Sequence, residues 1–230
     1  MNKTLILFCL LLGSQFTNGQ FLRDKVINLE NYDKPFLNWG YFLGLNQYDF
    51  KFDYKPGQDD ILVTKSLGFS VGLIGEMRIN NHFDLRFEPG LFYTRRDLMF
   101  PGFTEQRDFF REVKSTYIHF PLLLKVSAKR LNNFKPFVVG GFSTSVNLSS
   151  NAESPDDNNS GDFRMNKNTY YYELGVGIDF YLYYFKFSPS IRGVFALNDE
   201  LVRDVDPNSP WTGGVSKMST RGIFINFTFE

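Results

Sequence analysis

The 230-residue sequence contains a single cysteine, Cys9, and it lacks any internal run of about 18 apolar residues, the length that a transmembrane helix requires. A membrane-spanning helix is therefore excluded. Basic and acidic residues balance at 25 each, and this balance excludes binding to nucleic acid through a strongly basic surface. Only two histidines are present, so few side chains are suited to acid–base chemistry near neutral pH.

The N-terminus has the pattern of a secretory signal peptide. One lysine precedes an apolar run from Leu5 to Leu12, and small or polar residues follow, so we expect cleavage after Gly19. Cys9 lies inside this run, and Phe8 stands where a lipoprotein would need a small residue. The mature chain would then contain no cysteine and form no disulfide.

Apolar residues alternate with small or polar ones through most of the chain. In residues 67–80, LGFSVGLIGEMRIN, the odd positions through Ile79 are apolar or glycine, and most even positions are small, polar or charged. A period of two is typical of a β-strand with two unlike faces. The pattern predicts eight strands, at residues 39–46, 67–79, 83–96, 117–126, 138–148, 170–182, 185–197 and 222–229.

The connections between these segments alternate in length. Those after the second, fourth and sixth segments are short, and those after the first, third, fifth and seventh are long and polar. Short turns at one end and long loops at the other are typical of an up-and-down meander, the layout of outer-membrane barrels.

The total volume of the bulky side chains indicates whether they point into the barrel or outward. These faces carry about forty large apolar side chains, whereas the interior of an eight-stranded barrel is only just wide enough for side chains to fill it. The alternative is a secreted two-sheet sandwich with an internal apolar face, but glycine is an unusual choice for its water-facing positions. We therefore predict an all-β, eight-stranded antiparallel up-and-down transmembrane β-barrel with its bulky face in lipid.

This prediction divides the chain into a signal peptide (1–19), a periplasmic N-terminal segment (20–37) and an outer-membrane β-barrel (38–230). We expect the short turns and both termini to be periplasmic and the long loops to be extracellular. The expected partners are outer-membrane lipid and, during insertion, the barrel assembly machinery, since the chain ends on the aromatic strand INFTFE.

Several charged residues fall on the inward faces of the predicted strands. They are Glu76, Arg78, Asp84, Arg86, Glu88, Glu173, Asp179 and Arg192. We expect them to form a plug of opposite charges, because each buried ion requires a partner. The alternative is a gated or selective pore. We predict no large conductance.

No residue pattern points to catalysis. His82 falls in a short turn and is expected to be solvated, whereas His119 falls on an inward face. A histidine with a serine and an acid could transfer acyl groups, as in lipid-modifying barrel enzymes, but an interior polar residue is the simpler interpretation. The loop carboxylates lack the spacing of metal ligands. We therefore expect no catalytic residue, no metal site and no cofactor.

Three segments resemble known families. Residues 117–142, YIHFPLLLKVSAKRLNNFKPFVVGGF, and residues 173–182, ELGVGIDFYL, resemble the outer-membrane β-barrel family of Bacteroidota. Within that family, residues 26–52, VINLENYDKPFLNWGYFLGLNQYDFKF, look like the start of the PorT/SprT family of type IX secretion proteins.

The resemblance implies a non-enzymatic accessory or assembly component of type IX protein secretion, with a linked role in gliding motility. Other secretion components would be its partners. The N-terminal segment is then either a tether or a docking strap that also covers the barrel base. The residues expected to dock a partner are Asn31, Tyr32, Asp33, Lys34, Pro35 and Phe36. The alternatives are a small barrel for adhesion, ligand binding or envelope stability, and a lipid-modifying barrel enzyme.

Overall fold

The computed structural model describes residues 26–57 and 60–230. The expected signal peptide, residues 1–19, and the first part of the expected N-terminal segment, residues 20–25, lie outside the described residues. Within the described ranges, no helix combines the length and the apolar character needed to cross a membrane.

Antiparallel strands make up most of the described chain, with one short helix, α2 (Gln106–Phe109). The strands are β1 (Leu37–Tyr54), β2 (Leu62–Lys65), β3 (Leu67–Arg78), β4 (Phe83–Phe87), β5 (Gly90–Met99), β6 (Phe110–Ser127), β7 (Phe134–Asn147), β8 (Asn168–Tyr181), β9 (Lys186–Ala196) and β10 (Val215–Phe229).

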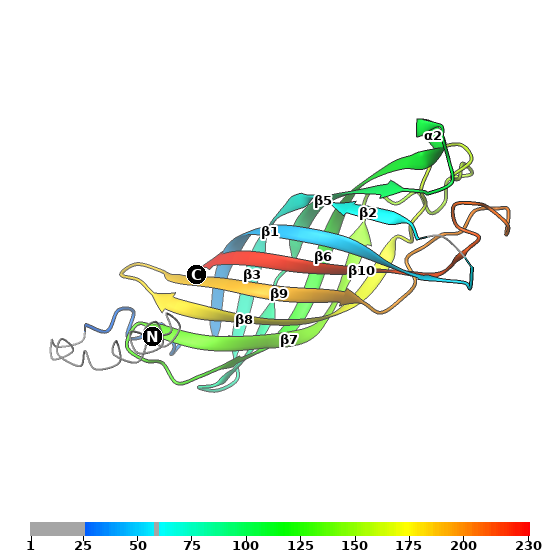
Figure 1. The fold of residues 1–230 in the computed structure, drawn as a ribbon. Coiled ribbons are helices and arrows are strands. Elements are labelled where there is room, and N and C mark those ends of the chain that lie inside the picture. The colour runs from blue at the N-terminus through cyan, green and yellow to red at the C-terminus, as the bar shows by residue number, and fades with distance from the viewer. Residues whose placement is uncertain (1–25, 58–59) are drawn as a thin grey trace, which may run out of the picture.

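The strands close into a ring (Figure 1). β1 pairs with β10 on one side and with β3 on the other, while β6 to β10 pair in sequence order. β4 and β5 lie end to end between β3 and β6, and β2 continues into β3, so the ring has eight positions. The prediction of an all-β antiparallel barrel is confirmed.

The segment expected to be one strand over residues 83–96 is interrupted after Phe87. Glu88 and Pro89 separate β4 from β5, because proline has no N–H to donate to a neighbouring strand. The Pro89 carbonyl still accepts a hydrogen bond of 2.9 Å from Leu73 N. The break therefore divides the expected strand into β4 and β5, and both remain between β3 and β6 in the ring.

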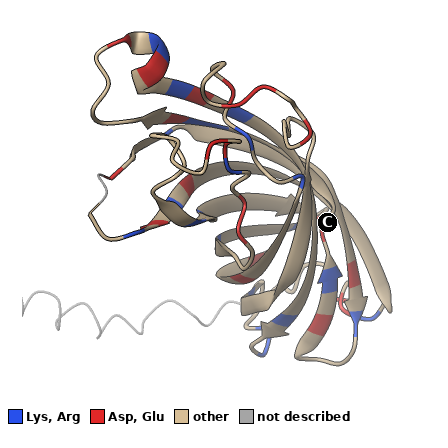
Figure 2. Ribbon diagram, turned by 90° about the vertical axis from the view of Figure 1, so that its right-hand side faces the viewer, with Lys and Arg blue, Asp and Glu red and all other residues tan. Residues whose placement is uncertain are grey.

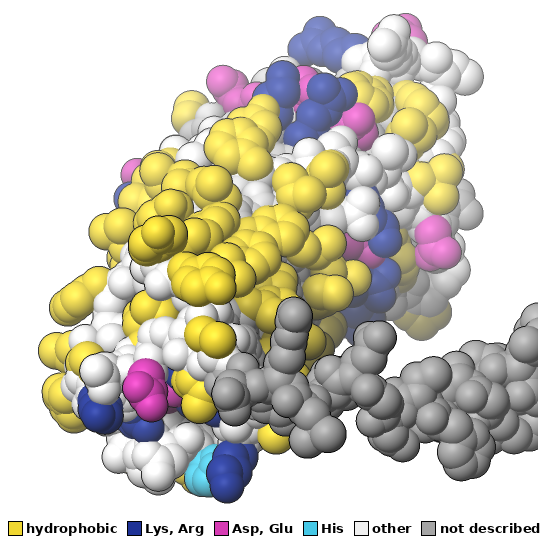
Figure 3. Space-filling view, turned by 90° about the vertical axis from the view of Figure 1, so that its left-hand side faces the viewer, with side chains coloured by type: hydrophobic (Ala, Val, Ile, Leu, Met, Phe, Trp, Pro, Cys, Tyr) yellow, Lys and Arg dark blue, Asp and Glu magenta, His cyan; other side chains and the backbone are white. Residues whose placement is uncertain are grey.

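The bulky apolar face points outward, as the volume of the side chains predicted. Large apolar side chains on the outer face are exposed, among them Trp39, Leu43 and Leu73, and they form a band between two charged ends (Figure 3). Along the ribbon, charged residues gather at the loop end and toward the short turns (Figure 2). An uninterrupted apolar belt of this kind is soluble only in hydrocarbon.

Three strands, β1, β6 and β10, extend seven or eight residues further toward the long loops than the alternation predicts, whereas β5 extends by only three, to Met99. The outward side chains of β1 change from Leu43 and Leu45 to Gln47, Asp49 and Lys51 as the strand continues. β6 starts at Phe110 and β10 at Val215, well before the expected 117 and 222. The polarity of the outer face reverses because these strand ends project beyond the lipid into water.

Glycines on the inner face make room for an aromatic ring. A Cβ built on Gly72 would lie 2.4 Å from Phe42 Cε1, and one on Gly90 would lie 2.7 Å from Phe42 Cζ. Any larger residue at either position would displace the Phe42 ring from the lumen. Inward glycine is therefore a packing requirement of this narrow interior.

Candidate functional site

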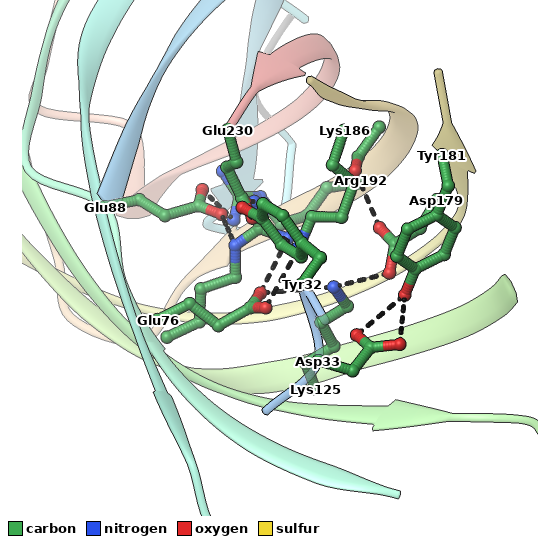
Figure 4. A network of polar contacts seen from close by, with 12 residues as sticks. Tyr32, Asp33, Glu76, Glu88, Lys125, Asp179, Tyr181, Lys186, Arg192 and Glu230 are labelled. Carbon is green, nitrogen blue, oxygen red and sulfur yellow. Dashed lines mark hydrogen bonds and ion pairs between the residues drawn. The ribbon is translucent and has the colours of Figure 1, made fainter. Parts of the chain in front are cut away.

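The turn end of the lumen is filled by a cluster of charged side chains, which we call the ion network (Figure 4). Its members come from β3, β4, β6, β8 and β9 and from the residues that follow β4 and β10. They are Glu76, Arg86, Glu88, His119, Lys125, Glu173, Asp179, Lys186, Arg192 and Glu230.

Glu76 is the most connected carboxylate of the ion network. Lys125 Nζ lies 3.1 Å from Glu76 Oε2, and Lys186 Nζ lies 3.1 Å from Glu76 Oε1. Arg86 Nη1 lies 3.7 Å from the same carboxylate. Lys125 also pairs with Asp179 at 2.8 Å. Each of these charges is buried, so each depends on the others for the solvation that water would supply.

A second chain of contacts continues toward the centre of the barrel. Arg86 Nε lies 2.8 Å from Glu88 Oε1, and Arg192 Nη1 lies 2.9 Å from Glu88 Oε2. Arg192 Nε lies 3.0 Å from Glu173 Oε2, and His119 Nε2 lies 2.7 Å from Glu173 Oε1. Alternating acids and bases therefore connect one side of the lumen to the other.

The structure brings together most of the charged residues singled out in the sequence, but two lie elsewhere. Arg78 is half-buried and donates to Asn81 Oδ1 at 2.9 Å in the adjoining turn. Asp84 is buried, yet no cation of the described residues lies within 4.0 Å of its carboxylate. Both lie next to the short turn between β3 and β4, and only Arg78 is partly open to solvent.

Sequence reasoning missed Lys125, Lys186 and Glu230 as members of the ion network. The two lysines have the inward parity of their strands, so strand alternation could have found them. Glu230 follows the last outward residue, Phe229, and its carboxylate contacts Lys186 and, at 2.8 Å, Arg86 Nη2. The C-terminal residue therefore joins β10 to the ion network.

His119 is enclosed in the lumen with 0% of its surface exposed. The rings of Phe92, Tyr171 and Phe224 surround it at centroid distances of 5.1, 5.5 and 6.0 Å. The paired acid that a catalytic histidine needs is present as Glu173. A lipid or acyl substrate cannot reach the imidazole through this packing, so the geometry favours the role of an interior polar residue.

Residues 26–36, which we call the strap, lie across the turn end of the barrel. The Asn28 amide N donates to Asn133 Oδ1 at 2.8 Å, and its side-chain amide donates to Tyr181 O at 3.0 Å. The Asp33 carboxylate accepts from the Tyr181 hydroxyl at 2.9 and 3.1 Å. The strap is thereby held by the turn that follows β6 and by the last residue of β8.

Tyr32 links the strap to the ion network. Its hydroxyl donates to Glu230 Oε2 at 3.4 Å, and Lys186 Nζ lies 5.0 Å from the centre of its ring. Burial raises the pKa of the Tyr32 phenol above its ordinary value, so the hydroxyl keeps its proton as a donor. Arg130 stacks on the Tyr181 ring at 3.6 Å and donates to the carbonyls of Asn28 and Leu29.

The six residues expected to dock a partner divide into two groups. Tyr32 and Asp33 turn toward the barrel and make the contacts described above. Asn31, Lys34, Pro35 and Phe36 are exposed, and Phe36 keeps 63% of its surface open to solvent. The segment therefore anchors itself with some of these residues and presents the others outward.

Toward the loop end, the lumen is filled by rings and then by a second apolar cluster. The Arg96 guanidinium is 3.8 Å from the Phe50 ring centre and donates to the Tyr117 hydroxyl at 2.8 Å. Above it, Phe50, Leu98 and Phe100 pack with side chains from the loops after β7 and β9. The described lumen is thus occupied from the strap to the long loops.

We predict that the purified protein forms no stable, porin-sized channel in planar lipid bilayers. The strap, the ion network, the rings around His119 and the loop-end cluster fill the described lumen. An eight-stranded ring has little further room for a water column. Single-channel current recording on protein refolded in detergent measures this directly, with a known trimeric porin as the positive control. Long-lived openings of porin size would contradict a plugged lumen.

Within residues 26–57 and 60–230, no group of three or more histidine, cysteine, aspartate or glutamate side chains is arranged to hold a metal ion. The chemistry that the ion network itself supports is structural: it neutralises buried charges and ties strands from opposite walls together.

The described chain matches the model of one known protein family. The family model described as "Outer membrane protein beta-barrel domain" matches residues 28–202. No curated protein matches the chain.

Solved structures with a similar arrangement share little sequence with the chain. OprG from Pseudomonas aeruginosa is 15% identical, with a TM-score of 0.46, over 84% of this chain and 93% of that one. Neisserial surface protein A is 10% identical, with a TM-score of 0.44, over 82% and 95%. Ail of Yersinia pestis, in complex with the heparin analogue sucrose octasulfate, is 13% identical, with a TM-score of 0.38, over 83% and 96%.

Proposed function

We propose that this chain, which belongs to the outer membrane protein β-barrel domain family, is a non-enzymatic accessory or assembly component of type IX secretion. A role in the gliding motility that depends on such secretion follows from the same proposal. The protein resides in the outer membrane, and it works through its surfaces. Its partners are other components of the secretion apparatus.

The observation that carries this proposal is the filled lumen. Folded cargo cannot pass through a ring of this size, and the ion network occupies the space that remains. The likeness of residues 26–52 to the start of PorT/SprT proteins supports the assignment to type IX secretion. A barrel without a passage contributes to export by binding or assembling other components.

In this proposal the short turns, the strap and both termini face the periplasm, and the long loops face outward. The lengths of the connections support this orientation, because outer-membrane barrels have short periplasmic turns and longer extracellular loops. The strap is then on the side where periplasmic secretion components are found. The exposed residues of the strap, Asn31, Lys34, Pro35 and Phe36, form the docking surface.

Deleting residues 21–36 is expected to abolish secretion of type IX cargo while leaving the barrel folded. The strap adds hydrogen bonds at the barrel base but contributes no strand to the ring. Cargo in the culture medium measures secretion, and heat-modifiable mobility on gels measures folding. Normal secretion by the deletion variant would remove the docking role.

A milder variant separates docking from anchoring. Phe36→Ser replaces an exposed ring whose side chain is free of the ion network, and we expect it to lower cargo secretion about tenfold, as loss of an aromatic anchor does. The matched control is Tyr184→Ser, which replaces a ring that is 93% exposed in the turn between β8 and β9 at the same end of the barrel. Equal secretion by both variants would show that Phe36 does not dock a partner.

The second candidate is a small barrel for adhesion, ligand binding or envelope stability. Loss of the gene separates the two. A specific block in cargo secretion supports the proposal, whereas a diffuse envelope defect with normal secretion supports the alternative.

A further inference from the structure

At the loop end, β6 extends past its neighbour β7. The pairing of β6 with β7 covers only Tyr117–Ser127 of β6, because β7 ends at Asn147. The last contacts on this side are Leu148 N to Thr116 O at 2.8 Å and Thr116 N to Ser149 Oγ at 3.3 Å. Residues 110–115 of β6 are therefore paired with β5 alone.

The backbone groups of Glu112 and Lys114 point toward this open side. In an antiparallel strand, alternate residues direct their N–H and C=O groups to the same neighbour. Thr116 directs its groups away from β5, and Glu112 and Lys114 share its parity. Among the described residues, no hydrogen bond reaches the backbone groups of these two residues from that side. Natural proteins usually cover or twist away such an edge.

A groove of about 640 Å³ lies along this edge. One wall is β6 from Phe110 to Ser115, and the other wall comes from the β7–β8 loop, including Ser149, Phe163 and Met165. The volume is within the range of sites that bind ligands, about 300–1,000 Å³. The free edge therefore faces a space, and nothing in the described chain fills it.

Arg111 also lines this groove. It is only 5% exposed, yet no carboxylate of the described residues lies within 4.0 Å of its guanidinium. Its donors reach backbone carbonyls, of Arg107, Phe110 and Asn158, the last at 2.7 Å. Its Nε has no partner. A buried cation that no carboxylate contacts directly is costly, so an anionic group close to the guanidinium is favoured at this position.

The groove is lined by two carboxylates, Glu112 and Asp162, and among the described residues neither lies within 4.0 Å of the Arg111 guanidinium. Glu112 is already held by Arg95 Nη1 and Lys114 Nζ, each at 2.8 Å. Arg107 and Lys114 add further positive charge to the lining. The groove therefore offers two unpaired backbone residues next to a buried arginine that no carboxylate contacts directly.

We propose that this groove binds an extended segment of a partner protein, which adds as a strand to the edge of β6 and places an acidic side chain beside Arg111. Backbone hydrogen bonds to Glu112 and Lys114 supply the affinity of strand addition, and side-chain contacts supply the selectivity. The residue of the added strand opposite Arg111 has its side chain on the same face of the sheet. This proposal does not rest on the role in secretion.

The test is a selection of random peptides of about ten residues, the length of a long strand, displayed on phage against the detergent-solubilised protein. Binders to the Lys114→Pro variant are removed, because proline lacks the N–H that points into the groove and is tolerated on an unpaired edge. We expect the enriched peptides to share alternating apolar residues and an acidic residue at one position. Failure to enrich any peptide for the wild type over Lys114→Pro overturns the proposal.

Two pairs of variants then distinguish the contribution of the backbone to peptide binding from that of the side chains. Binding is measured by fluorescence anisotropy of a labelled, enriched peptide. Lys114→Ala keeps the N–H and should bind as the wild type does, whereas Lys114→Pro should weaken binding about tenfold or more. Arg111→Met should weaken binding similarly and abolish the preference for aspartate over asparagine in the peptide, whereas Arg111→Lys should keep that preference. Heat-modifiable mobility verifies that each variant is folded.

Two outcomes contradict the proposal. Equal binding by Lys114→Pro and Lys114→Ala would show that the edge accepts no strand. A concentration-dependent dimer in detergent that Lys114→Pro disrupts, with no displacement by peptide, would show that the edge pairs with a second copy of this chain.

Discussion

Replacing Glu76 with glutamine is expected to lower the free energy of unfolding by about 3–5 kcal/mol, the cost of breaking a buried ion pair from one side. Glu76 is contacted by Lys125, Lys186 and Arg86. The substitution removes the shared counter-charge and leaves three buried cations with fewer carboxylates. Urea unfolding in lipid vesicles, followed by tryptophan fluorescence, measures the change.

The matched control is Arg78→Gln, which replaces a charged residue on the same strand whose partner is the turn residue Asn81. We expect it to change the free energy of unfolding by less than about 0.5 kcal/mol. The double variant Glu76→Gln with Lys125→Gln should lose less than the sum of the two single losses, since the two charges interact directly at 3.1 Å. A Glu76→Gln variant as stable as Arg78→Gln would show that the ion network does not stabilise the barrel.

Replacing Leu174 with arginine is expected to lower the free energy of unfolding by about 2–4 kcal/mol, the cost of a charge on the lipid face near the bilayer midplane. Leu174 lies in the middle of β8, on the outer face, with 61% of its surface exposed. The guanidinium would have to leave water for hydrocarbon or extend to a distant headgroup. The same unfolding measurement in vesicles reports the loss.

Gln47→Arg is the control for position along the barrel. Gln47 is also outward and exposed, but it stands on β1 beyond Leu45, where the outer face has become polar. We expect a loss of at most about 1 kcal/mol there, because charges near the interface cost little. Equal losses at the two positions would contradict the placement of the hydrocarbon between the two charged ends.

The alternation of side chains is a local property, and it was enough to predict the wall of the barrel. Odd and even positions of β3, from Leu67 to Met77, separate into the outer and inner faces that the sequence indicates. The extra length of β1, β6 and β10 escaped prediction because the outer face becomes polar there, as at Lys51 and Glu112. Where a strand extends beyond the lipid, apolar and polar residues no longer alternate along it, and this alternation is the signal by which a strand is predicted.

The contacts across the lumen could not be predicted from the sequence, because they depend on the closed ring of strands. Glu76 on β3 and Lys186 on β9 are 110 positions apart, and their meeting depends on the register of every strand between them. The same holds for the strap, whose Asp33 finds Tyr181 only once β8 has taken its place in the ring. No local pattern contains that information.

The sequence by itself determined that this protein is an antiparallel barrel with its bulky face in lipid, because a period of two fixes the faces and the volume of the side chains decides which face is outside. Only the tertiary structure decided which charges pair, how the strap covers the barrel base and where β6 is left with a free edge. Those features depend on distances between residues that are far apart in the chain, and closure of the ring alone sets those distances.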